Sequence, residues 1–423
     1  MQQLCVATAR SHTLSSVVAV ADAAVRAPHL LEAALMAPGG NAATTVRRQQ
    51  LARREALQGI GWLHSALELG NQSASTGHPS SWLSAARWWF DRSSVARTLT
   101  AAQPDIIETA EPFVLGGGVL DAADLLGVPA VALCQGDPLL GLQRGIACAH
   151  GLGPQDAPRR GRWVERRALG LLHRVYEGYD LVLVPSRTMT AQLQSLGVAH
   201  AAYQPIGIDC SVFTPNACDH AWRRSLEAQL CLAPGTRLLL YVGRFDKHLR
   251  LDLLADAVRR LGPGHALLAL GEGPCPPDGD AVHCLPGNLS AADRARMVAS
   301  CDAFVHAGGA AEHDGLALLE AMACGLPTVV SHAGALGELA SGAGTTVTGM
   351  RVEEWAEAMS AAVVNPSWVH FWAALERARN HDWSVVVQQQ ALRYRQAMGG
   401  ARPVRSIAPA RDRVDGARHA LSH

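Results

Sequence analysis

The chain has 423 residues, more than one typical hydrophobic core holds, so its length predicts two domains. Its 48% hydrophobic and 17% charged residues are typical of a folded protein and exclude a largely disordered one. The 37 basic and 37 acidic residues cancel to zero net charge, which argues against nucleic acid as the partner.

Hydropathy and cysteine usage favour a cytoplasmic protein. No stretch reaches the ~18 consecutive apolar residues that a membrane-spanning helix needs, and the apolar Val17–Ala21 is too short for a secretion signal. The ten cysteines form neither a CxxC pair nor another zinc-ligand spacing. We therefore expect reduced thiols, several of them buried as small hydrophobic side chains.

The first half of the chain carries the elements of one parallel sheet. Short apolar strands are expected at Asp105–Glu108, Ala130–Leu133 and Leu181–Pro185, with an apolar segment at Val119–Leu126. The turn-rich stretch Pro205–Asp209 marks a domain boundary. We therefore place the first domain at residues 1–207.

The second half alternates strands and helices more regularly. Ser290 and Asp293 resemble a capping box that opens a helix ending at Ala299, and apolar residues repeat at helical spacing between 251 and 261. This alternation predicts a doubly wound parallel sheet, which binds ligands at the carboxyl ends of its strands. We place this domain at 208–384, a further helix at 385–398 and a disordered tail at 399–423. Its strands are expected at Leu238–Gly243, Ala266–Gly271, Ala281–Leu285, Ala303–Ala307 and Thr328–Val330.

Two carboxylates, Glu312 and Glu320, stand eight residues apart, and the second lies in an apolar helix that ends at Gly325. The start of such a helix offers free amides and a positive dipole end, so the unit could hold a phosphate and a polyhydroxylated group together. The simpler interpretation makes Glu312 a solvated loop acid and Glu320 half of a structural ion pair. Because burying an unpaired carboxylate is costly, Glu320 needs a partner, and ribose hydroxyls would supply one.

Arg244 follows the strand that ends at Gly243, where a glycine lets a ligand approach the backbone closely. An arginine at the carboxyl end of a strand suits a diphosphate, and Lys247 lies three residues further on. An ordinary surface arginine is the alternative. The next strand leads into the turn Gly271–Gly273, whose glycines by themselves are a weak signal for a ligand.

A metal site is a weaker hypothesis at the same place. His313 and Asp314 stand beside Glu312, but no further ligands recur at metal-site spacing. We therefore expect neither a metal nor another cofactor.

Several motifs, taken in order, resemble those of the retaining nucleotide-sugar glycosyltransferases of family 4 (GT-B fold). The resemblance implies two Rossmann-like doubly wound domains that face each other across a cleft, with the last helix crossing back to the first domain. It also implies metal-independent transfer of a hexose from a UDP- or GDP-linked sugar to a lipid, glycan or small-molecule hydroxyl, with retention at the anomeric carbon. It covers most of residues 100–398 and rests on Pro104–Glu108, Val184–Arg187, Gln204–Asp209, Phe213–Pro215, Tyr241–Arg244, Gly271–Pro274, Glu312–Glu320 and Asp382–Ser384.

Carried over position by position, the resemblance gives each site residue a role. Arg244 would bind the donor diphosphate, Glu320 the ribose, and Glu312 the sugar hydroxyls near the reacting carbon. The amides of Gly315 and Leu316 would face the phosphates and stabilise the departing diphosphate, which could itself accept the acceptor's proton. The other residues expected to contact the substrate are Gly243, Lys247, Arg250, Gly271, Gly273, Asp314, Gln135, Ser15 and Ser16.

Four places depart from the family pattern. Leu249 stands five residues after the diphosphate arginine, where the family usually carries a lysine. Ser15 and Ser16 replace part of a glycine-rich loop, Gln135 replaces a histidine, and Asp314 replaces an aromatic residue. These departures keep two other hypotheses open. One is a catalytically impaired paralogue that binds a nucleotide sugar or a partner protein without turnover, and the other is a different GT-B enzyme such as a nucleotide-sugar epimerase.

The basic stretch from Arg159 to Arg167 precedes leucines at helical spacing. Many members of the family that this chain resembles use a basic first-domain surface to sit on anionic membranes, which would place the protein peripherally at the inner membrane face. We favour a solvated helix face instead, because arginine is the general cation of this chain: Lys247 is the one lysine among 37 basic residues.

Overall fold

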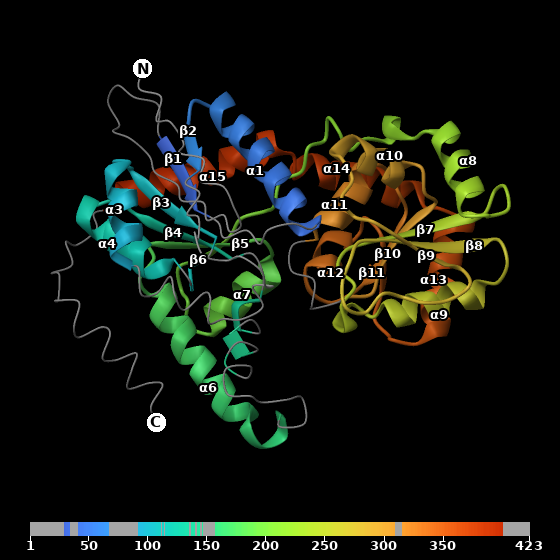
Figure 1. Cartoon of the computed structure of the whole chain (residues 1–423), viewed down its shortest axis with the longest axis horizontal. Helices are drawn as coiled ribbons and strands as arrows, with labels where there is room; N and C mark the ends of the chain where they lie inside the picture. The colour runs from blue at the N-terminus through green and yellow to red at the C-terminus, as the bar shows by residue number, and fades with distance from the viewer. Residues whose placement is uncertain are drawn as a thin grey trace.

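The computed structural model places the chain in two α/β lobes, each built on its own parallel sheet (Figure 1). It describes residues 29–33, 41–66, 92–110, 112–113, 115–134, 137–139, 142–143, 146, 157–308 and 315–400. Of the tail expected to be disordered, 399–423, residues 401–423 lie outside the described residues, whereas Gly399 is the last residue of a helix.

The first sheet has six strands in the order β2-β1-β3-β4-β5-β6, and every neighbouring pair is parallel. The expected strands appear as β3, β4 and β5. The sequence analysis missed β1, β2 and β6 because these strands are short and contain no β-branched residue. The strands are β1 His29–Ala33, β2 Leu63–Ala66, β3 Ile106–Thr109, β4 Ala130–Leu133, β5 Leu181–Val184 and β6 Ala201–Tyr203. The helices are α1 Asn41–Gly59, α3 Arg92–Ala101, α4 Gly116–Leu126, α6 Ala157–Tyr176 and α7 Arg187–Ser195.

The second sheet also has six parallel strands, in the order β12-β11-β10-β7-β8-β9. All five strands expected in this half are present, and β12 is additional. The strands are β7 Arg237–Val242, β8 His265–Leu270, β9 Val282–Leu285, β10 Ala303–His306, β11 Thr328–Ser331 and β12 Thr345–Val347. The helices are α8 His220–Gln229, α9 Leu251–Leu261, α10 Ala291–Ala299, α11 Leu316–Ala323, α12 Gly334–Ala340, α13 Val352–Val364 and α14 Trp368–Asn380, with short 3-10 helices η2 Pro215–Ala217 and η3 Lys247–Leu249.

Strand β7 shows why this sheet is buried on both faces. Successive side chains of a strand point to opposite faces, and Leu238 and Leu240 pack in one hydrophobic cluster while Leu239 and Tyr241 pack in another. All four side chains are fully buried. A continuous apolar run is therefore the sequence signature of a parallel strand covered by helices on both sides.

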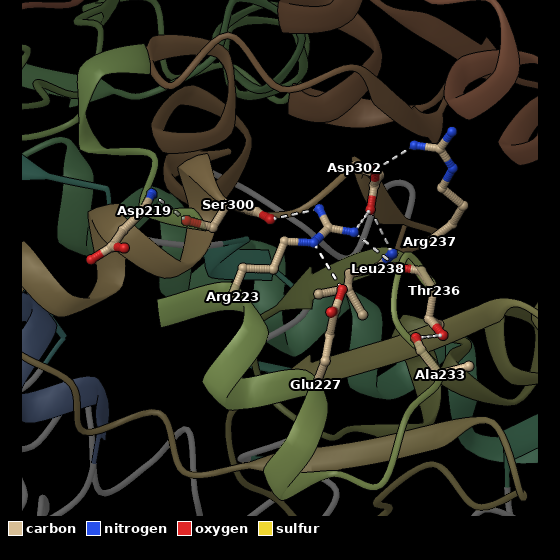
Figure 2. Close-up of polar contacts among 9 residues, drawn as sticks. All are labelled: Asp219, Arg223, Glu227, Ala233, Thr236, Arg237, Leu238, Ser300 and Asp302. Carbon is tan, nitrogen blue, oxygen red and sulfur yellow. Dashed lines mark hydrogen bonds and ion pairs between the residues drawn. The ribbon is translucent and has the colours of Figure 1, made fainter. Parts of the chain in front are cut away.

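Arg223 on α8 fixes the amino-terminal end of the second sheet (Figure 2). Its guanidinium donates to the Glu227 carboxylate at 3.1 Å, to the Asp302 carboxylate at 2.7 Å, and to the carbonyls of Ser300 and Thr236. Asp302 also accepts from the Leu238 amide at 2.8 Å. The cluster therefore ties α8 to the starts of β7 and β10, opposite the edge where the sequence analysis expects a ligand.

The last helix, α15 Trp383–Gly399, returns to the first lobe (Figure 1). Val387, Ala391 and Tyr394 belong to the hydrophobic core of that lobe. The two connections between the lobes lie side by side, at Ile208 and at Asp382. The Ile208 amide donates to the His381 carbonyl at 2.8 Å, and the Trp383 amide donates to the Ile208 carbonyl at 3.0 Å.

A buried polar network holds α15 in place. The Arg53 guanidinium on α1 binds both oxygens of Glu108 on β3, at 2.7 and 2.9 Å. It also donates to Gln390 at 3.1 Å and to the Tyr394 hydroxyl at 2.9 Å, both on α15. Glu108 is fully buried. The network therefore joins α1, β3 and α15 within the core of the first lobe.

Helix α6 contains the basic stretch singled out in the sequence. Val164, Ala168 and Leu172 are buried on one face, while Arg162 and Arg166 are exposed on the other. This amphipathic pattern is the one expected of a solvated helix face. Within the described residues, no helix combines the length and apolarity needed to cross a bilayer.

Candidate functional site

The described part of the expected site lies at the carboxyl edge of the second sheet. Arg244 follows β7, the glycine turn follows β8, and Gly315 begins α11 after β10. Five expected site residues lie outside the described residues, and their roles stay predictions: Ser15, Ser16, Gln135, Glu312 and Asp314.

The start of α11 depends on a glycine. Gly315 is the N-cap residue and has φ +66°, a conformation that glycine adopts without strain. A Cβ at this position would lie 2.4 Å from Leu339 Cδ1, so any other residue would have to displace the Leu339 side chain. The first turn of α11 carries amides that the helix itself does not bond, at its positive dipole end. That the amides of Gly315 and Leu316 face phosphates stays a prediction, and the start of α11 is the element that would present them.

Arg244 is exposed just after the end of β7, and a hydrogen bond holds its backbone in place. The Tyr241 hydroxyl donates to the Arg244 carbonyl at 2.7 Å. A Cβ on Gly243 would lie 2.7 Å from that same hydroxyl oxygen, so the glycine permits this turn. Within the described residues no hydrogen bond or ion pair engages the Arg244 guanidinium, so it can approach an anion at the carboxyl edge of the sheet. Lys247, three residues further on, is exposed as well.

The glycines of the turn after β8 have a structural explanation. A Cβ on Gly271 would lie 1.8 Å from the Gly243 carbonyl oxygen, and one on Gly273 would lie 2.4 Å from the Phe245 carbonyl oxygen. The Phe245 amide donates to the Glu272 carbonyl at 2.8 Å. These glycines therefore let the turn pack directly on the Arg244 loop, which accounts for their presence without any ligand.

Two cations, Lys247 and Arg250, flank Leu249, the position where the family usually carries a lysine, and either could take the place of that lysine. Arg250 caps α9 at φ +53°, and its Nε lies 3.0 Å from a carboxylate oxygen of Asp252. Leu249 is buried, and a Cβ on Gly308 would lie 2.7 Å from its Cδ2. The Arg250 charge is thus already engaged and Leu249 fills apolar space, so Lys247 is the better candidate of the two cations.

Glu320 corrects one step of the sequence reasoning. Its side chain is 1% exposed, and one of its carboxylate oxygens lies 2.6 Å from Arg294 Nε and 2.5 Å from Arg294 Nη2. Arg294 comes from α10 and is itself buried. The partner that the buried acid needs is therefore an arginine of the same lobe, and burial no longer argues for ribose hydroxyls. The structural ion pair, given as the simpler interpretation, is present.

His306 is a buried residue of this edge that the sequence analysis missed. It ends β10, and the Gly308 amide donates to its Nδ1 at 3.0 Å. Its ring lies 4.9 Å from that of Tyr241, measured between centroids. Burial lowers the pKa of His306 to about 4, so the ring is neutral near pH 7. A histidine at the carboxyl end of a strand is the signal that would have found it.

A pocket of about 380 Å³ lies at the opposite, amino-terminal end of the second sheet. It borders the Arg223–Asp302 cluster, whose charges are already paired (Figure 2). It is therefore separate from the carboxyl edge. Within the described ranges, no three His, Cys, Asp or Glu side chains come together as metal ligands.

Two family models match the chain. The model described as Glycosyl transferases group 1 matches residues 236–365, and the model described as Glycosyltransferase Family 4 matches residues 47–212. The first match contains the whole second sheet, and the second contains most of the first.

Curated relatives match at about 30% identity. A GDP-mannose-dependent alpha-mannosyltransferase of Mycolicibacterium smegmatis is 30% identical over 246 residues, which cover 56% of this chain and 58% of the relative. The sulfoquinovosyl transferase SQD2 of Arabidopsis thaliana is 28% identical over 249 residues, which cover 56% of this chain and 44% of the relative. The chain thus spans about half the length of the curated relatives it matches.

Solved structures match over more of the chain. Sucrose-phosphate synthase of Thermosynechococcus elongatus has a TM-score of 0.65 at 18% identity, covering 85% of this chain and 94% of that one. HepE of Anabaena, solved in complex with UDP and glucose, has a TM-score of 0.55 at 18% identity. The match covers 71% of this chain and 81% of HepE. At these identities the likeness concerns the fold, which is the GT-B arrangement of two Rossmann-like domains.

Proposed function

Since the chain belongs to the glycosyl transferases of group 1 and family 4, we propose that it transfers a hexose from a nucleotide diphosphate sugar to a hydroxyl group. The acceptor belongs to a lipid, a glycan or a small molecule, and the anomeric carbon keeps its configuration. GDP-mannose is the first donor to test, because several curated relatives are named as GDP-mannose-dependent mannosyltransferases.

One observation carries this proposal: an exposed arginine and the start of a helix lie at the same edge of the second sheet. Arg244 follows β7, and Gly315 opens α11 after the neighbouring strand β10. A guanidinium can bind a diphosphate with two parallel hydrogen bonds, and the start of the helix adds its positive dipole end. Both groups stabilise negative charge, which is what a departing nucleoside diphosphate develops.

The proposed chemistry needs few protein groups beyond these. As the bond to the diphosphate breaks, positive charge develops at the anomeric carbon in an oxocarbenium-like transition state. Glu312 would contact the sugar hydroxyls near that carbon. The departing phosphate would take the acceptor's proton on the same face of the sugar, which gives retention without a separate general base and without a metal.

A second candidate is a protein that binds a nucleotide sugar without turnover. The observation that favours it is the state of the cations near Arg244: Leu249 fills the family's lysine position with a buried apolar side chain, and Arg250 is paired with Asp252. Fewer free positive charges then face the diphosphate, which weakens stabilisation of the leaving group more than ground-state binding.

Donor binding and turnover separate these candidates. Purified protein would be titrated with GDP-mannose and with UDP-glucose, with and without a divalent cation, while thermal stability and nucleotide release are recorded. Stabilisation with nucleotide release supports the transferase, and stabilisation without release across a broad acceptor panel supports the binding protein. No stabilisation by any nucleotide sugar rejects both.

A pair of arginine variants tests the proposed site. Arg244→Ala removes the proposed diphosphate contact, so we expect donor affinity to fall by about ten- to a hundred-fold, the range for a charge-assisted contact. Arg224→Ala is the matched control, because Arg224 is also exposed but lies on α8 at the opposite end of the sheet. Equal affinities for the two variants would remove Arg244 from the site.

A further inference from the structure

Glu338 connects the two lobes through the start of a helix. It lies on α12 of the second lobe, and its carboxylate accepts hydrogen bonds from the amides of Arg187 and Thr188, which begin α7 of the first lobe. The donor–acceptor distances are 2.9 Å for Arg187 and 3.1 Å for Thr188 to the same oxygen, and the Thr188 hydroxyl adds a contact at 3.3 Å. An acid of one domain thus supplies the N-terminal cap for a helix of the other.

This cap completes the first turn of α7. The first amides of a helix have no partner within the helix, and a carboxylate beside them also faces the positive dipole end. Ser186 bonds the Met189 amide at 3.1 Å, so Ser186 and Glu338 together satisfy all three of the first amides. The Glu338 side chain is only 21% exposed, which limits competition from water. Breaking the contact therefore leaves two amides of α7 without a protein acceptor.

Helix α12 is held rigidly within its own lobe. Arg377 on α14 donates to the carbonyls of Glu338 and Leu339, at 3.2 and 2.7 Å, and to that of Ser341 at 3.1 Å. A Cβ on Gly337 would lie 1.7 Å from the His332 carbonyl oxygen, so this turn of backbone is closely packed. The position of Glu338 therefore moves with the second lobe as a whole.

The same helix contacts the edge proposed to bind the donor. Leu339, the neighbour of Glu338, packs against Gly315 with its Cδ1 2.4 Å from the site of an added Cβ. Helix α7 follows β5 and α12 follows β11, so both come from the carboxyl edges of their sheets. One short helix thus touches α7 of the first lobe and the start of α11 of the second.

We propose that Glu338 is a positioning residue for glycosyl transfer: by capping α7, it holds the first lobe at the distance from α11 that the reaction requires. The inference rests on the proposed function, in which the second lobe binds the donor and the first lobe supplies the acceptor side. Binding of a nucleotide to the second lobe alone does not need this contact. Transfer does, because misplacement of the two reactants by about 1 Å can cost a hundred-fold in rate.

The test compares Glu338→Ala, Glu338→Gln and the control Glu376→Ala, an exposed acid on α14. In Glu338→Ala we expect turnover of the nucleotide sugar to fall at least ten-fold, while the affinity for free nucleoside diphosphate stays within about two-fold of wild type. Glu338→Gln keeps an acceptor oxygen without the charge, so we expect its turnover to lie between those of wild type and Glu338→Ala. Parallel losses of affinity and turnover, or unchanged turnover in Glu338→Ala, would overturn the proposal.

A second readout is independent of activity. Hydrogen exchange in the peptide covering Arg187–Met189 should be about ten-fold faster in Glu338→Ala than in wild type or Glu376→Ala, because the cap is lost. Small-angle scattering should show a wider distribution of distances between the lobes. Unchanged exchange and scattering reject the positioning role even where no donor is turned over. A wild-type protein that binds no nucleotide sugar, yet shows these changes in Glu338→Ala, instead rejects the proposed function.

Discussion

Arg294 and Glu320 form a buried ion pair that joins α10 to α11, with two guanidinium nitrogens at 2.6 and 2.5 Å from one carboxylate oxygen. Both side chains are at least nine-tenths buried. Desolvation makes such a pair costly to form, yet removing one partner leaves an uncompensated charge in the core, which costs more than removing both. The pair therefore fixes α11, whose first turn is proposed to face the donor phosphates.

The ion pair gives a direct prediction about stability. Arg294→Met should lower the free energy of unfolding by about 3–5 kcal/mol, since the buried Glu320 carboxylate then loses the guanidinium that compensates its charge. The double variant Arg294→Met with Glu320→Gln should recover part of that loss, because no charge remains at the site. Urea unfolding of the two single variants and the double variant measures the coupling, and additive losses would show that the pair makes no net interaction.

The glycine turn gives a second prediction. Gly271→Ala places a Cβ 1.8 Å from the Gly243 carbonyl oxygen, so the turn must move away from the Arg244 loop. We expect a loss of stability of about 1–3 kcal/mol, the usual cost of overpacking, together with weaker donor binding.

A glycine with open space around it is the matched control for that variant. Gly170 lies within α6, and an added Cβ there meets no atom within 4 Å. Gly170→Ala should therefore raise stability by about 0.5–1 kcal/mol, because alanine has the higher helix propensity. Thermal unfolding compares the two variants, and equal effects would contradict the close approach described for Gly271.

A third prediction concerns the helix that returns to the first lobe. The Tyr394 hydroxyl accepts from Arg53 at 2.9 Å and from Gln390 at 2.7 Å within the buried network. Tyr394→Phe leaves those donors without this acceptor and should cost about 1–3 kcal/mol. Tyr179→Phe is the control, because the buried Tyr179 hydroxyl has no hydrogen-bond partner in the described part of the chain. Chemical denaturation should find Tyr179→Phe neutral, and equal losses in both would assign no role to the network.

The sequence predicted the second lobe better than the first for a physical reason. Strand β7 is buried from Leu238 to Val242, and a continuous apolar run of this kind can be recognised without knowing the fold. Strands β1, β2 and β6 are short and poor in β-branched residues, so only their pairing with neighbours makes them strands.

The candidate site shows the same limit at the level of side chains. Arg244, Gly315 and Glu320 belong to motifs that can be recognised from their spacing in the sequence. Arg294 and Glu338 cannot be recognised in this way. Arg294 lies in a polar stretch typical of a surface helix, and Glu338 contacts residues about 150 positions away. Spacing therefore predicts where a ligand site lies, whereas ion pairing and burial within it arise only from the folded packing.

A final prediction follows from His306 and concerns stability against pH. Burial holds the pKa of His306 at about 4 in the folded protein, below its ordinary value of 6.5, so the folded ring stays neutral while the unfolded ring takes up a proton. The unfolded state then binds more protons between pH 6.5 and 4, and the free energy of unfolding falls as the pH falls through this window. At roughly 1.4 kcal/mol for each pH unit, the full loss of stability over this window is about 3.5 kcal/mol, and no such loss occurs above the unfolded pKa of 6.5.

His306→Gln removes this titration, so its denaturant midpoint should depend less steeply on pH between 6.5 and 4 than that of wild type. The buried His381 and the partly buried His283 also have lowered pKa values through desolvation, so part of the pH dependence should remain. The exposed His220 supplies the control His220→Gln, which should keep the wild-type slope. Parallel curves for His306→Gln and wild type would contradict this prediction. They would mean that His306 has the same pKa in the folded and the unfolded protein, so that burial does not keep its ring neutral.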